Sequence, residues 1–170
     1  MLKYLWKDLM DALKYLPFGL LAGVVFVFLL MAAYALTGKK RPAGMWAHAA
    51  FIMYVVILLC ITFFSRESGS RSGVDLKLFS TWGINARNNA FVIENIILFI
   101  PYGLVCAWAF PVLRSLIPCA MTGLVTSLLI ESMQLYTHRG YYQVDDILTN
   151  LLGSIIGYLI FRMISRRRIS

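Results

Sequence analysis

Charged side chains are scarce in this chain: Asp, Glu, Lys and Arg together make up 14% of its 170 residues, whereas a soluble domain carries about 25%. Hydrophobic residues make up 60%, and the mean hydropathy is +0.74. The apolar residues come in blocks long enough to cross a bilayer. This pattern excludes an ordinary soluble domain and predicts an all-α fold, namely a polytopic membrane helix bundle.

Cysteine is also rare, and Cys60, Cys106 and Cys119 all lie inside apolar blocks. An odd number of cysteines without metal-binding spacing favours small buried hydrophobic residues over disulfides or metal ligands. The chain also lacks a phosphate-binding glycine loop, a His-Glu-x-x-His motif and a Gly-x-Ser-x-Gly motif. We therefore expect no metal and no cofactor. The N-terminus lacks a short apolar core with a small-residue cleavage site, so we expect no removable signal peptide.

Acidic residues are the scarcer charged class, with 8 against 16 basic residues and a net charge of +8. Such a surplus can indicate nucleic-acid binding, but the basic residues cluster at the ends of apolar blocks and at the C-terminus. At those positions they would meet lipid headgroups. We therefore expect membrane lipids as partners and no nucleic acid.

The apolar blocks predict about five transmembrane helices behind one interfacial helix. Leucines at helical spacing, opposite lysines and aspartates, predict an amphipathic helix over residues 1–16 that lies in the membrane interface. The predicted spans are 17–36, 45–64, 90–110, 115–135 and 144–164. The bundle thus covers 17–164, and a basic cytoplasmic tail covers 165–170. We interpret 65–89 and 136–143 as polar loops.

Basic residues give the orientation. With the N-terminus outside, eight lie on each side of the membrane, so the raw count is a tie. The compact Lys39-Lys40-Arg41 turn and the arginines at 162 and 166–168 are the cleaner signals for a cytoplasmic side. They predict that the N-terminus is outside and that the C-terminus is cytoplasmic.

Polar residues sit where spans begin and end. Arg66 ends the second span, Glu94 and Asn95 are near the start of the third, Glu131 and Gln134 are near the end of the fourth, and Asp145, Asp146 and Asn150 are near the start of the fifth. Because these helices alternate in direction, all of these ends share one membrane face, whichever way the protein inserts.

This set of residues favours a functional polar cleft that opens to one surface. Ser127, Glu131, Gln134 and His138 are spaced by four, three and four residues, which places them on one stripe of a helix. A charged residue at mid-bilayer costs about 2.5–3.5 kcal/mol. The structural alternative is that Asp145 or Asp146 caps the last helix. Capping alone does not require Glu131, Gln134 and Arg139 together.

Three blocks in this order resemble the VanZ-like family, named for a protein linked to glycopeptide resistance, in particular to teicoplanin. They are Asn95–Gly103, Glu131–Gln134 with Arg139, and Asp145–Gly157, within about residues 50–160. Arg66, Arg71 and residues 74–79 correspond to the family's basic loop segment. The resemblance implies a small polytopic protein of the bacterial cell envelope, in the cytoplasmic membrane, that contributes to teicoplanin-type resistance. It does not define a biochemical activity.

The hypothesis we favour is a binding protein. Arg66, Arg71 and Arg139 would hold an anionic headgroup, such as a teichoic acid or a lipid-linked cell-wall precursor, by bidentate hydrogen bonds. Glu131 and Asp146 would hold these arginines in place. The expected ligand-binding residues are Arg66, Arg71, Glu94, Asn95, Glu131, Gln134, Arg139, Asp145, Asp146 and Asn150, and we expect the cleft on the outer side.

Two alternatives stay open. An intramembrane enzyme could act on an envelope lipid or phosphate ester, with Glu131, Glu94 or Asp146 as general base. The missing nucleophile motif and the lack of paired histidines count against it. A small transporter is the third hypothesis, and five spans without an inverted repeat or broken helix make it weak.

Overall fold

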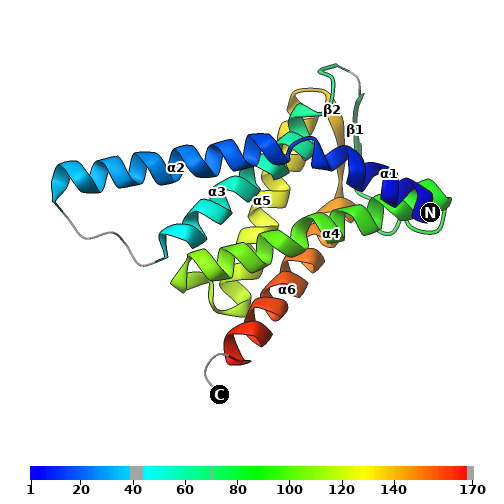
Figure 1. Ribbon diagram of the computed structural model, residues 1–170. Coiled ribbons are helices and arrows are strands. Elements are labelled where there is room, and N and C mark those ends of the chain that lie inside the picture. The colour runs from blue at the N-terminus through cyan, green and yellow to red at the C-terminus, as the bar shows by residue number, and fades with distance from the viewer. Residues whose placement is uncertain (39–43, 70, 168–170) are drawn as a thin grey trace.

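The computed structural model describes residues 1–38, 44–69 and 71–167 (Figure 1). The elements in chain order are α1 (Leu2–Leu13), α2 (Leu16–Thr37), α3 (Met45–Leu59), the π-helical turn η1 (Cys60–Phe64), β1 (Arg71–Asp75), α4 (Ala86–Ala109), the 3₁₀ turn η2 (Pro111–Leu113), α5 (Leu116–Tyr136), β2 (Arg139–Gln143) and α6 (Val144–Arg167). The Lys39-Lys40-Arg41 turn and the end of the predicted tail, from Arg168, lie outside the described residues.

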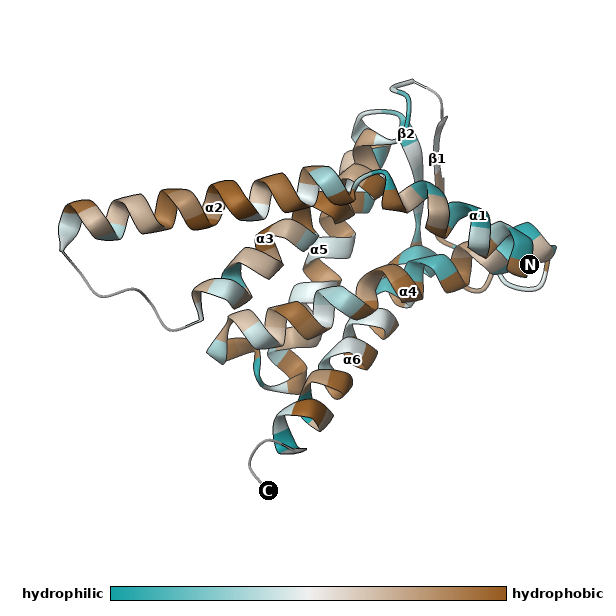
Figure 2. Cartoon of the chain, viewed as in Figure 1, coloured by the Kyte–Doolittle hydropathy of each residue, from teal (hydrophilic) through white to brown (hydrophobic). Residues whose placement is uncertain are grey.

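Within this described part, five helical segments are long and apolar enough to cross a membrane: Leu2–Thr37, Met45–Phe64, Ala86–Ala109, Leu116–Tyr136 and Val144–Arg166. The predicted all-α, multi-pass membrane bundle is therefore confirmed. The first segment is divided, since α1 ends at Leu13 and α2 begins at Leu16. Hydrophobic residues are nearly continuous along α2, whereas hydrophilic residues gather on α1 and at the start of α4 (Figure 2).

One helix begins earlier than its apolar pattern indicates. We predicted the third span from residue 90, and α4 begins at Ala86. The Asn85 side chain caps it by accepting hydrogen bonds from the backbone amides of Arg87 and Asn88, which satisfies donors that a helix start leaves unpaired. The cap extends α4 by one polar turn beyond its apolar stretch.

The centre of the bundle is the close pair α4 and α6. A Cβ atom at Gly153 or Gly157 would overlap the carbonyl oxygen of Ile96 or Ile100 in α4, so these two glycines allow the backbones to approach, as small residues do in membrane helix pairs. The buried core around this pair consists of Leu58, Phe99, Tyr102, Cys106, Ala107, Cys119, Ile130 and Tyr158.

The structure differs from the sequence prediction at the two segments interpreted as loops. Each contains a five-residue strand, and β1 and β2 pair in parallel, with Arg71 opposite Arg139 and Asp75 opposite Gln143. The crossover between them includes α4 and α5, and parallel strands require such a long connection. The sheet lies at the end of the bundle where α3 stops and α6 starts (Figure 1).

Candidate functional site

A cavity of about 690 Å³ lies at this end of the bundle. Its walls come from α1, η1 and the residues just after it, the start of α4, β2 and the start of α6. Four of the predicted ligand-binding residues line it, namely Arg66, Glu94, Asn95 and Asp146, together with the polar residues Thr62, Thr81, Tyr141 and Gln143. The convergence expected from helix alternation is thus present in the structure.

The polar floor of the cavity is built around Arg66. Its guanidinium interacts electrostatically with the carboxylates of Glu131 and Asp146, and the Asn95 side chain lines the cavity together with Asp146. Glu131 is only 3% exposed, and its Oε2 accepts the backbone N–H of Gln143 at 3.1 Å. Of the three candidate general bases, Glu94 and Asp146 line the cavity, whereas Glu131 is buried beside it.

Gln134 and Arg139 bond to the backbone that carries Arg66. The buried Gln134 donates from Nε2 to the carbonyl oxygen of Thr62 at 2.7 Å. Arg139 donates from Nη1 to the carbonyl oxygens of Arg66, at 2.6 Å, and of Phe63, at 3.3 Å. Its guanidinium also lies 4.7 Å from the centre of the Phe63 ring. These contacts join the end of η1 to α5 and β2, so both residues position Arg66.

Asp145 holds the loop between β1 and α4. Its carboxylate accepts the backbone N–H of Phe79 at 2.6 Å and of Thr81 at 2.9 Å, which places Thr81 at the cavity wall. Within the same loop, the Ser80 hydroxyl and the Lys77 backbone amide donate to Asp75 and lower the pKa of its carboxyl below the usual value. Two carboxylates thus order the loop: Asp75 at the end of β1 and Asp145 at the start of α6.

Asn150 lies deeper in the bundle. It is 4% exposed, and its Nδ2 donates to the Ser127 hydroxyl at 2.9 Å. The predicted stripe of α5 therefore faces α6 at this pair, although the pair is away from the cavity lining. For Arg71, the backbone pairs with Arg139 in the sheet, and its side chain lies outside the described part of the structure.

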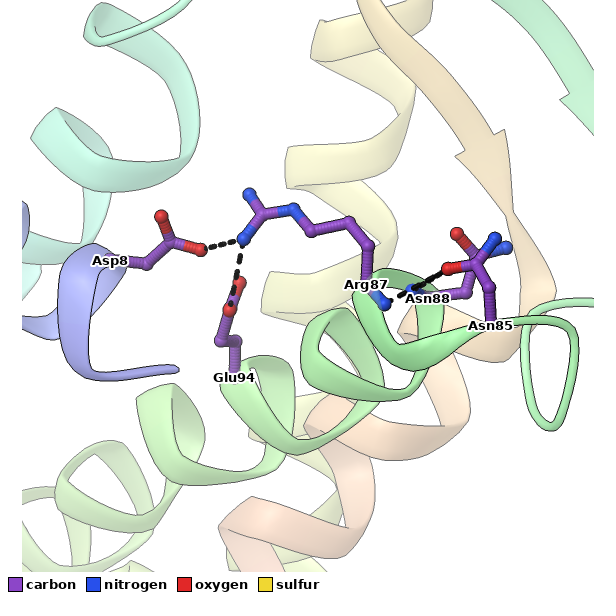
Figure 3. Close-up of polar contacts among 5 residues, drawn as sticks. All are labelled: Asp8, Asn85, Arg87, Asn88 and Glu94. Atoms are coloured by element: carbon purple, nitrogen blue, oxygen red, sulfur yellow. Dashed lines mark hydrogen bonds and ion pairs between the residues drawn. The ribbon is translucent and has the colours of Figure 1, made fainter. Parts of the chain in front are cut away.

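Two charged residues that the sequence analysis did not select join α1 to the site (Figure 3). Arg87 of α4 forms an ion pair with Asp8 of α1, and its Nη1 lies 3.7 Å from Oε1 of Glu94. The same guanidinium lies over the rings of Phe91, at 4.2 Å, and Tyr4, at 5.3 Å. The seven-residue spacing of Arg87 and Glu94 is a helical repeat that could have revealed their pairing. No sequence pattern links either of them to Asp8.

The donor set does not resemble a metal centre. Among the described residues, no group of three or more His, Cys, Asp or Glu side chains is arranged to hold a metal ion. The charged lining residues are the acids Asp8, Asp11, Glu94 and Asp146 and the bases Lys14, Arg66 and Arg87. The lining thus combines charged side chains of both signs.

Comparison with known proteins identifies a family. The family model described as VanZ/LLP1 matches residues 51–165, a range that contains part of α3, both strands, α4, α5 and most of α6. No curated protein matches the chain, and no solved structure matches it. The matched range includes every cavity-lining residue from Ile61 onward, whereas those between Leu2 and Tyr15 precede it.

Proposed function

The chain belongs to the VanZ/LLP1 family, and we propose on that premise that its cavity binds the anionic headgroup of a lipid-linked cell-envelope molecule. The observation that carries this proposal is the position of Arg66. This residue is exposed, lines the cavity and has its backbone held by Arg139. The ligand class is a lipid-linked cell-wall precursor or a teichoic acid, and the setting is the outer face of the bacterial cytoplasmic membrane.

Arg66 suits a phosphate group for geometric reasons. A guanidinium offers parallel N–H donors that match two oxygens of one anionic group. Asp146 and Glu131 interact with it from the protein side. Their role is to orient the guanidinium and to lower the cost of keeping it near lipid.

The charges of the cavity-lining residues further restrict which headgroup we expect to bind. The cavity has four lining acids and three lining bases, and Arg87 is already paired with Asp8. A multiply charged anion would meet repulsion from the remaining carboxylates. We therefore expect binding through a single phosphodiester group, as in a teichoic acid, to be preferred over binding through a diphosphate group.

Binding at the outer face of the membrane would give the cavity a role in glycopeptide resistance. A protein that holds or shields an envelope lipid at the outer surface changes what a glycopeptide of the teicoplanin type meets there. We therefore also propose that the protein contributes to such resistance.

The test is a binding measurement on purified protein in lipid nanodiscs, with phosphodiester-linked and diphosphate-linked envelope lipids as probes. We expect Arg66→Ala to weaken binding about 10- to 100-fold, because a charge-assisted hydrogen bond contributes about 1.5–3 kcal/mol. Arg66→Lys should recover part of the affinity, since it keeps the charge without the paired donors.

Lys77→Ala is the matched control, because Lys77 is an exposed cation of the neighbouring loop that does not line the cavity. Absence of binding, or equal binding by the Arg66→Ala protein, would contradict the proposal. Turnover of a bound phosphate ester that is lost in Asp146→Asn would instead support the enzyme hypothesis.

A further inference from the structure

One wall of the cavity is apolar, and α1 supplies much of it. Leu2, Leu5, Leu9 and Ala12 line the cavity, and their spacing of three, four and three residues places them on one stripe of the helix. The apolar lining residues contributed by η1 and α4 are Ile61, Phe91, Ile97 and Leu98. The polar floor with Arg66 and Asp146 belongs to the same cavity.

This apolar stripe is not packed into the protein. No residue of α1 is buried, and Leu9 is 51% exposed although it lines the cavity. An amphipathic helix at a membrane places its apolar face against protein or hydrocarbon. Here that face borders a space of about 690 Å³, which is within the range of about 300–1,000 Å³ for small-molecule sites.

A hydrocarbon chain at this wall would cover apolar side chains, and removing apolar surface from water is favourable. A soluble phosphate would satisfy the polar floor and leave the α1 stripe uncovered. Only a ligand with both a polar and an apolar part matches both walls.

We propose, resting on the proposed function, that the cavity binds an amphiphile whose hydrocarbon chain lies along the Leu5–Leu9 stripe of α1 while its phosphate headgroup meets Arg66. The ligand reaches the cavity from the bilayer, and α1 is the part of the site that recognises the chain. The Asp8–Arg87 ion pair holds α1 at the distance that leaves room for the chain.

The experiment compares three probes on the full chain in nanodiscs: a long-chain phosphodiester lipid, a short-chain analogue with the same headgroup, and soluble glycerophosphate. We expect affinity to fall at least tenfold from the first probe to the last. Leu9→Trp fills the chain side of the cavity and should weaken long-chain lipid binding at least fivefold, with glycerophosphate binding unchanged.

Met10→Trp is the matched control. Met10 is 49% exposed and does not line the cavity, so this variant should bind all three probes like the parent protein. Retained Arg66-dependent glycerophosphate binding shows that a variant is folded.

Equal affinity for the three probes, with continued dependence on Arg66, would overturn the role of α1 and leave the proposed function standing. Equal effects of Leu9→Trp and Met10→Trp would also overturn the role of α1. Absence of binding to all three probes would overturn both proposals.

Discussion

At the scale of single residues, Gly140 controls the space beside the Arg66 side chain. A Cβ atom at Gly140 would lie 2.5 Å from Nη1 of Arg66 and 3.2 Å from Oε1 of Gln134. Since Nη1 is the end of a flexible side chain, we expect Gly140→Ala to fold and to displace the guanidinium. Headgroup affinity should fall several-fold, with a shift in unfolding temperature of only a few degrees, as measured by lipid binding and thermal unfolding.

Ser72→Ala is the comparison for this prediction. Ser72 is the register partner of Gly140 in the sheet, and its side chain is exposed. A loss of affinity that is equal in the two variants would mean that the sheet, rather than the space beside Arg66, determines binding.

The sequence could predict which polar residues gather at one face. It could not predict which of them line the cavity and which hold other parts of the site in place. The gathering of Arg66, Glu94 and Asp146 follows from helix alternation alone. The direction of each side chain depends on partners that are distant in the chain, such as the Thr62 carbonyl that accepts from Gln134. For this reason Arg139, predicted to bind ligand, is found bonded to the backbone of η1.

At the scale of elements, the contact between α1 and α4 depends on Arg87. Its guanidinium forms an ion pair with Asp8 and a cation–π contact with the Tyr4 ring. Among the described residues, it is the one charged group that contacts α1 in both of these ways. A partly exposed ion pair contributes about 0–1 kcal/mol and a cation–π contact about 0.5–1 kcal/mol. Arg87→Ala should therefore loosen α1 without unfolding the bundle.

Hydrogen exchange is the measurement that distinguishes a loosened α1 from an unfolded bundle. We expect faster exchange of α1 amides in Arg87→Ala, unchanged protection in α4 and α6, and weaker binding of long-chain lipid. Lys3→Ala removes an exposed cation of α1 and should change none of these. Loss of protection across the whole bundle would show that Arg87 stabilises the fold rather than the position of α1.

The two strands are the elements that sequence reasoning missed. Arg-Ser-Gly-Val-Asp and Arg-Gly-Tyr-Tyr-Gln are short and show no clear alternation of apolar and polar residues, which is the usual signal for a strand. Their pairing depends on the helices between them, which bring residues 71–75 and 139–143 together. The spans were predictable because their apolar length alone determines them.

At the scale of the whole molecule, the contacts within the site decide which basic residues are informative about the orientation in the membrane. The raw count is eight on each side of the membrane. However, Arg87 is paired with Asp8 and Arg139 donates to two carbonyl oxygens, so their place on the cavity side follows from these bonds. Arg162 and Arg166, at the opposite end of α6, have exposed side chains. The sorting of basic residues toward the cytoplasm therefore applies more directly to them.

We accordingly expect the cavity to face outward and the end of α6 to face the cytoplasm. In a variant with the three native cysteines replaced by alanine, Ser72→Cys in β1 should react with a membrane-impermeant maleimide in intact cells. Ser165→Cys near the end of α6 should react only after permeabilisation, and the cysteine-free chain gives the background. The reverse pattern would place the cavity in the cytoplasm. Arg66 would then meet lipids of the inner leaflet, and shielding of an outer-surface target from a glycopeptide would no longer be possible.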